Sequence, residues 1–155
     1  MVTPADGGCF CGAVRYRLSQ EPLTLYACHC TDCQRHTGGS FALFMVVPRD
    51  GLEVLQGEPS RYAVTFPNGL EKYGRFCPRC GSVLWGEPVK FPQIVTVRPG
   101  TLDVTSGLAP IAHIWTRSAQ PWVAIPTGTL RFETQPEDWM ALVTAWQRRA
   151  RNAGG

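Results

Sequence analysis

The sequence has little of what marks a membrane, secreted or disordered protein. Its longest uninterrupted apolar run, residues 41–47, is far shorter than a membrane-spanning helix needs. Residues 1–6 contain neither a basic leader nor an apolar core, so we expect no secretory signal. Apolar residues make up 44% of the chain and charged residues 17%, which is the composition of a folded protein. We therefore expect a soluble, cytoplasmic protein.

Repeats, linkers and low-complexity tracts are also lacking. The 155 residues suit a single domain, which we expect over residues 3–150. The formal net charge of +3 assumes neutral thiols, and two Zn²⁺ ions bound by seven thiolates would cancel it. Arg148, Arg149 and Arg151 lie near the end of a predicted helix without interleaved aromatic residues, which favours a solvated helix terminus. We expect neither nucleic acid nor a membrane as a partner.

Proline and glycine, by contrast, are abundant. Thirteen prolines and sixteen glycines separate short runs in which apolar and polar residues alternate, a pattern typical of a mostly β domain. Val14, Tyr16 and Leu18 alternate with arginines and predict a half-buried strand. Strands over residues 61–66 and 70–76 are expected to flank a turn at 67–69. Further strands are expected at residues 41–47, 52–55, 82–85, 93–97 and 130–132.

One helix is predicted, over residues 134–150. Thr134 and Glu137 match a capping box around Pro136. Apolar residues then recur at helical spacing, so that they share one face of the helix. These residues are Trp139, Leu142, Val143 and Trp146.

Seven cysteines form the strongest signal, and their odd number and the reducing compartment favour metal ligands over disulfides. The run Cys77-Pro78-Arg79-Cys80-Gly81 is a zinc knuckle, in which two thiolates face one ion and the glycine permits a tight turn. A structural zinc takes four ligands. The run Cys9-Phe10-Cys11-Gly12 can supply the other two, which predicts a closed site of four cysteines.

The remaining cysteines lie together in Cys28-His29-Cys30-Thr31-Asp32-Cys33. Their three thiolates can converge on one ion if the backbone turns at Thr31-Asp32. Three protein ligands leave a fourth position for water or substrate, which is typical of a catalytic zinc. A closed structural site completed by His29, His36 or Asp32 is the alternative. An iron–sulfur cluster is less favoured, since the spacing matches no common cluster motif.

Several residues near this second group are candidates for chemistry. We place His36 in a loop on the open side of the metal as a catalytic candidate, with Arg35, Thr37 and Gly38 as substrate contacts. His29 lies between two ligands, so its ring is expected to point away from the metal and to pack or hydrogen-bond elsewhere. Among the other aromatic and charged residues, we expect His113 in the core or at its rim, Trp85, Trp115 and Trp122 in the core, and Arg117 in solvent or on a substrate carboxylate.

Three stretches resemble the glutathione-dependent formaldehyde-activating enzyme and centromere protein V family. They are Gly7-Gly8-Cys9-Phe10-Cys11-Gly12-Ala13-Val14-Arg15-Tyr16, Cys28-His29-Cys30-Thr31-Asp32-Cys33-Gln34-Arg35 and Phe76-Cys77-Pro78-Arg79-Cys80-Gly81-Ser82. The run Gly100-Thr101-Leu102-Asp103 and the run His113-Ile114-Trp115 also fall where family members carry similar stretches.

The resemblance implies a β-rich, Mss4-like fold of antiparallel sheets with a zinc knuckle and one C-terminal helix. It implies that Cys9, Cys11, Cys77 and Cys80 hold a structural zinc and that Cys28, Cys30 and Cys33 hold a catalytic one, two Zn²⁺ in all. The implied activity is condensation of glutathione with formaldehyde to S-(hydroxymethyl)glutathione, formally that of a carbon–sulfur lyase. A non-catalytic zinc-stabilised binding module and a thiol-based redox or metal sensor are the alternatives. The sequence leaves the oligomeric state open.

Overall fold

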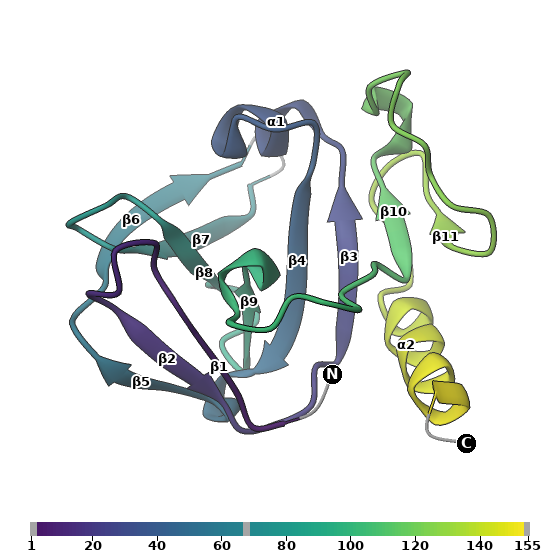
Figure 1. The fold of residues 1–155 in the computed structure, drawn as a ribbon. Coiled ribbons are helices and arrows are strands. Elements are labelled where there is room, and N and C mark those ends of the chain that lie inside the picture. The colour runs from purple at the N-terminus through teal and green to yellow at the C-terminus, as the bar shows by residue number, and fades with distance from the viewer. Residues whose placement is uncertain (1–2, 67–68, 154–155) are drawn as a thin grey trace. The chain divides into compact units, whose positions relative to one another are not determined.

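A computed structural model describes residues 3–66 and 69–153 of the chain (Figure 1). It divides into two compact units, the first formed by Met1–Pro22 and Met45–Leu108 and the second by Leu23–Phe44 and Ala109–Gly155. The described residues form eleven strands and two α-helices, so the chain is mostly β, as the sequence predicts. No helix within these residues is long and apolar enough to cross a membrane.

The first unit contains two antiparallel sheets. One has the order β1-β2-β5, and the other places β9, β8, β7 and β6 side by side, with the last four residues of β4 paired to β9. The strands are β1 (Ala5–Gly8), β2 (Arg15–Leu18), β4 (Ala42–Pro48, which begins in the second unit), β5 (Leu52–Gln56), β6 (Ser60–Thr65), β7 (Glu71–Phe76), β8 (Val83–Pro88) and β9 (Ile94–Val97).

Strand β2 shows how the sequence positions this unit's core. Tyr16 and Leu18 are fully buried while Arg15 and Arg17 lie nearer the surface, so the predicted alternation is confirmed. The Tyr16 ring meets the buried Trp85 of β8 edge to face at 5.8 Å. The Tyr16 hydroxyl is 2.7 Å from Thr101 Oγ1.

The second unit combines three parallel strands with two helices. Strand β3 (Thr24–Cys28) pairs with β10 (Ala112–Ile114), which pairs with β11 (Leu130–Arg131), and the helices are α1 (Thr31–Thr37) and α2 (Met140–Ala153). Every residue of β3 is buried. Helix α2 packs on β3, where the Trp139 ring meets Tyr26 at 5.2 Å and Thr24 Oγ1 donates to the carbonyl of Leu142.

All the predicted strands are present, but several other expectations need correction. The sequence analysis anticipated only antiparallel sheets, whereas β3, β10 and β11 run parallel. Of the expected turn at 67–69, residues 67 and 68 lie outside the described residues, and Gly69 has the positive φ of 78° that the turn needs. Trp85 is buried as predicted, but Trp122 is 73% exposed, so its place in the core was wrong.

Helix α2 begins six residues later than predicted, at Met140. The capping box of Thr134 and Glu137 is therefore wrong. The carboxylate of Asp138 instead accepts the N–H of Met140 at 2.8 Å, which satisfies one of the free donors of the first turn.

Candidate metal sites

The seven cysteines fall into two groups, and each lies within one unit. Their sulfurs lie within 4.8 Å of one another in a four-cysteine group in the first unit and in a three-cysteine group in the second. None forms a disulfide. The four-cysteine group is Cys9, Cys11, Cys77 and Cys80, and the three-cysteine group is Cys28, Cys30 and Cys33.

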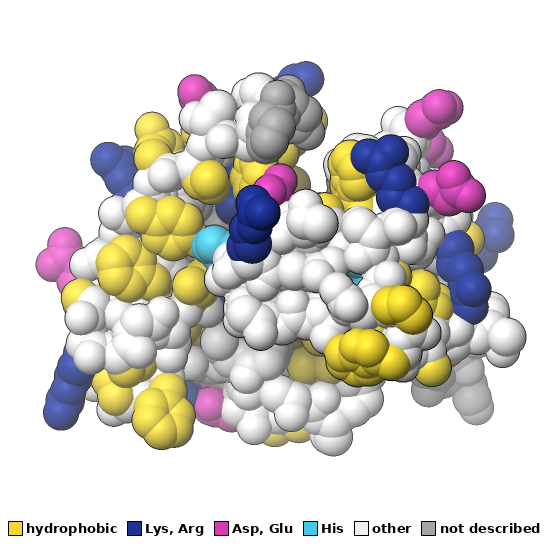
Figure 2. Space-filling view, turned by 90° about the horizontal axis from the view of Figure 1, so that it is seen from above, with side chains coloured by type: hydrophobic (Ala, Val, Ile, Leu, Met, Phe, Trp, Pro, Cys, Tyr) yellow, Lys and Arg dark blue, Asp and Glu magenta, His cyan; other side chains and the backbone are white. Residues whose placement is uncertain are grey.

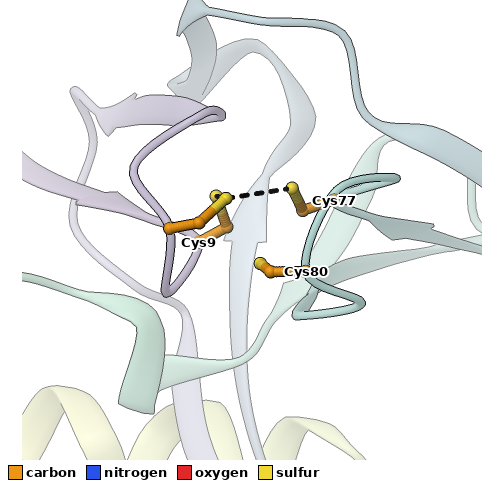
Figure 3. Close-up of side chains that lie close together, drawn as sticks. Cys9, Cys77 and Cys80 are labelled. Carbon is orange, nitrogen blue, oxygen red and sulfur yellow. Dashed lines mark hydrogen bonds between the residues drawn. The ribbon is translucent and has the colours of Figure 1, made fainter.

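Two tight turns build the four-cysteine group. In the first, Cys9 N–H bonds to the carbonyl of Val14, and Gly12 N–H bonds back to Cys9. In the second, Gly81 N–H bonds back to Cys77. Both turns end on a glycine with positive φ, 73° at Gly12 and 76° at Gly81, where a side chain would be strained. Figure 3 shows that Cys9, Cys77 and Cys80 consequently direct their sulfurs toward a common centre.

Ser82 joins the two turns, a role that sequence reasoning missed. Its hydroxyl accepts the N–H of Phe10 at 3.1 Å and lies 3.2 Å from Cys80 Sγ. This hydroxyl, with backbone N–H groups, lowers the pKa of the Cys80 thiol to about 5. A further backbone bond, from Val14 N–H to Cys9 Sγ at 3.2 Å, favours the thiolate of Cys9 in the same way. Negative charge is therefore favoured at Cys80 and Cys9.

The three-cysteine group forms where β3 ends and α1 begins. Cys28 is the last residue of β3 and is buried, and Cys30 is the N-cap of α1. Cys30 Sγ accepts the N–H of Cys33 at 3.3 Å and lies 3.5 Å from Cys28 Sγ. Hydrogen bonds from the other two thiols hold the pKa of Cys30 well below its usual range. Cys28 and Cys33 are buried, whereas Cys30 is partly exposed.

Sulfur separations in both groups fit zinc. Four sulfurs about 2.3 Å from a tetrahedral zinc would lie about 3.8 Å apart. The structure gives 3.6 Å for Cys9 and Cys11, 3.8 Å for Cys11 and Cys77, and 3.5 Å for Cys28 and Cys30. Both groups can thus hold a metal ion that prefers soft ligands. Among the described residues, no imidazole or carboxylate joins the three-cysteine group within 4.8 Å.

The candidates after Cys33 lie on a helix rather than in the loop that the sequence analysis expected. Arg35, His36 and Thr37 belong to α1, and Gly38 ends it with a positive φ of 67°. All four are exposed. His36 and Thr37, three and four residues after Cys33, share its helical face, whereas Arg35 lies on the opposite side of the helix.

His29, between two of the cysteines, turns its ring into the core of the second unit. Its Nε2 lies 2.8 Å from Nδ1 of His113, and the two rings stack at 5.1 Å. Both histidines are buried, as expected for rings that pack and hydrogen-bond. Burial lowers both pKa values, that of His113 to about 4, so the pair is neutral at neutral pH.

Charged side chains of both signs are interspersed on the face shown in Figure 2, where basic groups lie singly or in small groups. Arg117, expected in solvent or on a substrate carboxylate, is exposed and lies 4.9 Å over the Trp115 ring. This cation–π contact can hold the Arg117 guanidinium group in place without a substrate carboxylate.

Comparison with known proteins identifies relatives of this chain. The sequence profile of the family described as glutathione-dependent formaldehyde-activating enzyme matches residues 4–118. A Halomonas elongata protein and a Penicillium rubens protein share the name "Putative glutathione-dependent formaldehyde-activating enzyme". The first is 30% identical over 125 residues, 77% of this chain and 80% of its own length. The second is 29% identical over 94 residues, 55% of this chain and 48% of its own.

The fold also has a counterpart among solved structures. The crystal structure of a Rhodobacter sphaeroides protein matches with a TM-score of 0.50 at 21% identity. The match covers 82% of this chain and 98% of the other. At this identity the likeness supports the fold.

Proposed function

The chain belongs to the glutathione-dependent formaldehyde-activating enzyme family, and on that premise we propose that it is a zinc-dependent enzyme of the carbon–sulfur lyase type. It would act on a thiol adduct, with glutathione and formaldehyde as the reacting pair. One observation carries this proposal: three sulfurs converge at the start of α1, with no fourth His, Asp or Glu ligand among the described residues. Three protein ligands are the pattern of a zinc site that receives substrate.

The four-cysteine group has a different role in this proposal. Its ligands come from two turns far apart in the sequence, and four sulfurs would complete the tetrahedral coordination of one zinc ion. A zinc there would be structural, with no position left for a substrate. We propose two Zn²⁺ per chain, one for each group.

A zinc ion held by Cys28, Cys30 and Cys33 would keep a substrate thiol in its thiolate form at neutral pH. In the overall reaction the thiol sulfur forms a bond to the carbonyl carbon of formaldehyde. The C=O π electrons move to oxygen, and the proton that leaves the thiol ends on that oxygen, so atoms and charge balance. The reverse reaction breaks the same carbon–sulfur bond.

The chain's exposed groups beside the cysteines would orient the substrate. His36 and Thr37 are the stronger candidates because they share the helical face of Cys33. We propose His36 as the proton donor to the alkoxide oxygen and Thr37, Gly38 and Arg35 as contacts to the remainder of glutathione. Arg35 lies on the opposite side of α1, so a substrate would contact it only by extending around the helix.

Residues 3–150 would act as one functional domain. We place the protein in the cytoplasm, where free thiolates and glutathione coexist. Neither nucleic acid nor a membrane has a part in this function.

A titration of the Co²⁺-loaded protein with glutathione tests the proposal. Cobalt replaces zinc in thiolate sites and reports each added sulfur ligand by its visible absorption. We expect glutathione to change the spectrum saturably, S-methylglutathione to leave it unchanged, and Cys33→Ser to abolish the change. We also expect the native protein, and not Cys33→Ser, to accelerate exchange between glutathione and its formaldehyde adduct in NMR exchange spectra. Equal effects of both ligands, or no acceleration, would contradict the function.

A further inference from the structure

Between Cys28 and Cys30, both backbone polar groups of His29 are hydrogen-bonded. The N–H of His29 donates to the carbonyl of Ile114 at 3.0 Å. Its carbonyl accepts two hydrogen bonds, from Gln34 Nε2 at 2.8 Å and from Ser118 Oγ at 3.1 Å. Its ring is paired with His113. The residue that separates two candidate ligands thus has little freedom to rotate.

One side chain, Gln34, connects most of these contacts. Its Nε2 donates to the carbonyl of Ser118 at 2.9 Å as well as to that of His29. Its Oε1 accepts from Gln120 Nε2 at 2.9 Å. Both N–H bonds and the oxygen of the Gln34 amide are therefore used, which fixes its orientation.

An uncommon backbone conformation at Trp115 positions the segment that contains Ser118. Trp115 has a φ of 58°, the one positive φ of a non-glycine residue in the described part of the chain. It turns the chain from β10 into the 3-10 turn Thr116–Ser118, where the Ser118 hydroxyl reaches both Trp115 O and His29 O. A bulky residue keeps such a conformation only where its surroundings impose it.

We propose that Gln34, supported by Ser118, is a positioning residue for the three-cysteine group, an inference that rests on the proposed function. Neither side chain would touch the metal or the substrate. A rotation of the His29 peptide would redirect Cys28 and Cys30 together, because they flank it. By bonding the His29 carbonyl, Gln34 and Ser118 keep the two sulfurs at the separation that a metal needs. Groups that orient metal ligands in this way set affinity and site geometry.

The test is the variant Gln34→Glu, which keeps the shape of the side chain and replaces the donating Nε2 by an oxygen. That oxygen would face two carbonyl oxygens and repel them. We expect competition with a chelator to show metal affinity at the three-cysteine group reduced by about 10- to 100-fold. Affinity at the four-cysteine group should stay unchanged. The Co²⁺ absorption of the three-cysteine site should also shift. The matched control is Gln93→Glu, the same change at an exposed residue of the first unit.

A second pair of variants keeps the test decisive if Gln34→Glu fails to fold. Ser118→Ala removes one donor to His29 and should lower affinity at the same site, and Ser118→Thr should restore it. Suppose that the native protein binds two metal ions and that these variants keep its metal affinity and its Co²⁺ spectrum. This result would overturn the positioning role of Gln34 and Ser118 but leave the proposed function standing. A native protein that binds a single metal would overturn the proposed function, and this inference with it.

Discussion

At the scale of single residues, Glu87 shows how this chain carries a buried charge. Its side chain is 12% exposed and accepts hydrogen bonds from Arg75 Nε and Nη2 and from Trp85 Nε1. Burial alone would raise its pKa, but these bonds and the charges of Arg75 and Arg49 outweigh it, so the pKa of Glu87 is lowered. The folded protein therefore favours the charged form of Glu87 over its protonated form more strongly than the unfolded chain does.

We predict that Glu87→Gln lowers the free energy of unfolding by about 1–3 kcal/mol at neutral pH, because Arg75 loses a charged partner. A lowered carboxylate pKa contributes stability above the ordinary value of 4.5, and this contribution is lost as the pH falls through the folded-state pKa. Urea unfolding of the zinc-loaded proteins should hence give the same difference at pH 6 and pH 8. Glu71→Gln, at an exposed position of β7, is the control. A difference that vanished at pH 8 would refute this account of Glu87.

At the scale of elements, the start of α2 is the sharpest correction to the sequence analysis. Asp138→Ala should reduce the free energy of unfolding by about 1 kcal/mol, because the Met140 N–H loses its partner. Thr134→Ala and Glu137→Ala, the two residues of the wrong capping box, should each have a smaller effect. Chemical denaturation followed by circular dichroism measures all three. Equal losses in the three variants would show that the helix begins earlier.

Local patterns predicted much of the fold, and long-range pairings were missed. The alternation at Tyr16 and the glycines after Cys11 and Cys80 act over a few residues, so their turns and strands could be read directly. The parallel pairing of β3 with β10 depends on segments that lie 86 positions apart in the register of Ala112 with Tyr26. No local period reports such a partner.

In the candidate site, too, local features could be predicted from the sequence and long-range contacts could not. The two groups of cysteines could be predicted because ligand number and spacing are local properties. Helix α1 was missed because its seven residues are too few for a clear apolar period. The contacts of Ser118 and Gln120 with Gln34, 84 and 86 residues apart, carry no signal in a single sequence.

At the scale of the whole molecule, each unit contains one group of cysteines. The four-cysteine group joins the turn after β1 to the turn after β7, so a zinc there would close a long loop of the first unit. Structural zinc sites supply on the order of 10 kcal/mol of folding free energy. The three-cysteine group lies within six consecutive residues and joins no distant segments by itself. The two groups should therefore differ in what their loss does to the chain.

The direct test of this claim is the zinc content and unfolding of Cys80→Ser and Cys33→Ser beside the native protein. Elemental analysis should give close to two zinc ions for the native chain and one for Cys33→Ser, whose cooperative melt should remain. Cys80→Ser should lose cooperative unfolding or aggregate. If Cys33→Ser unfolded as badly as Cys80→Ser, or kept both zinc ions, the division into a structural and an open site would be contradicted.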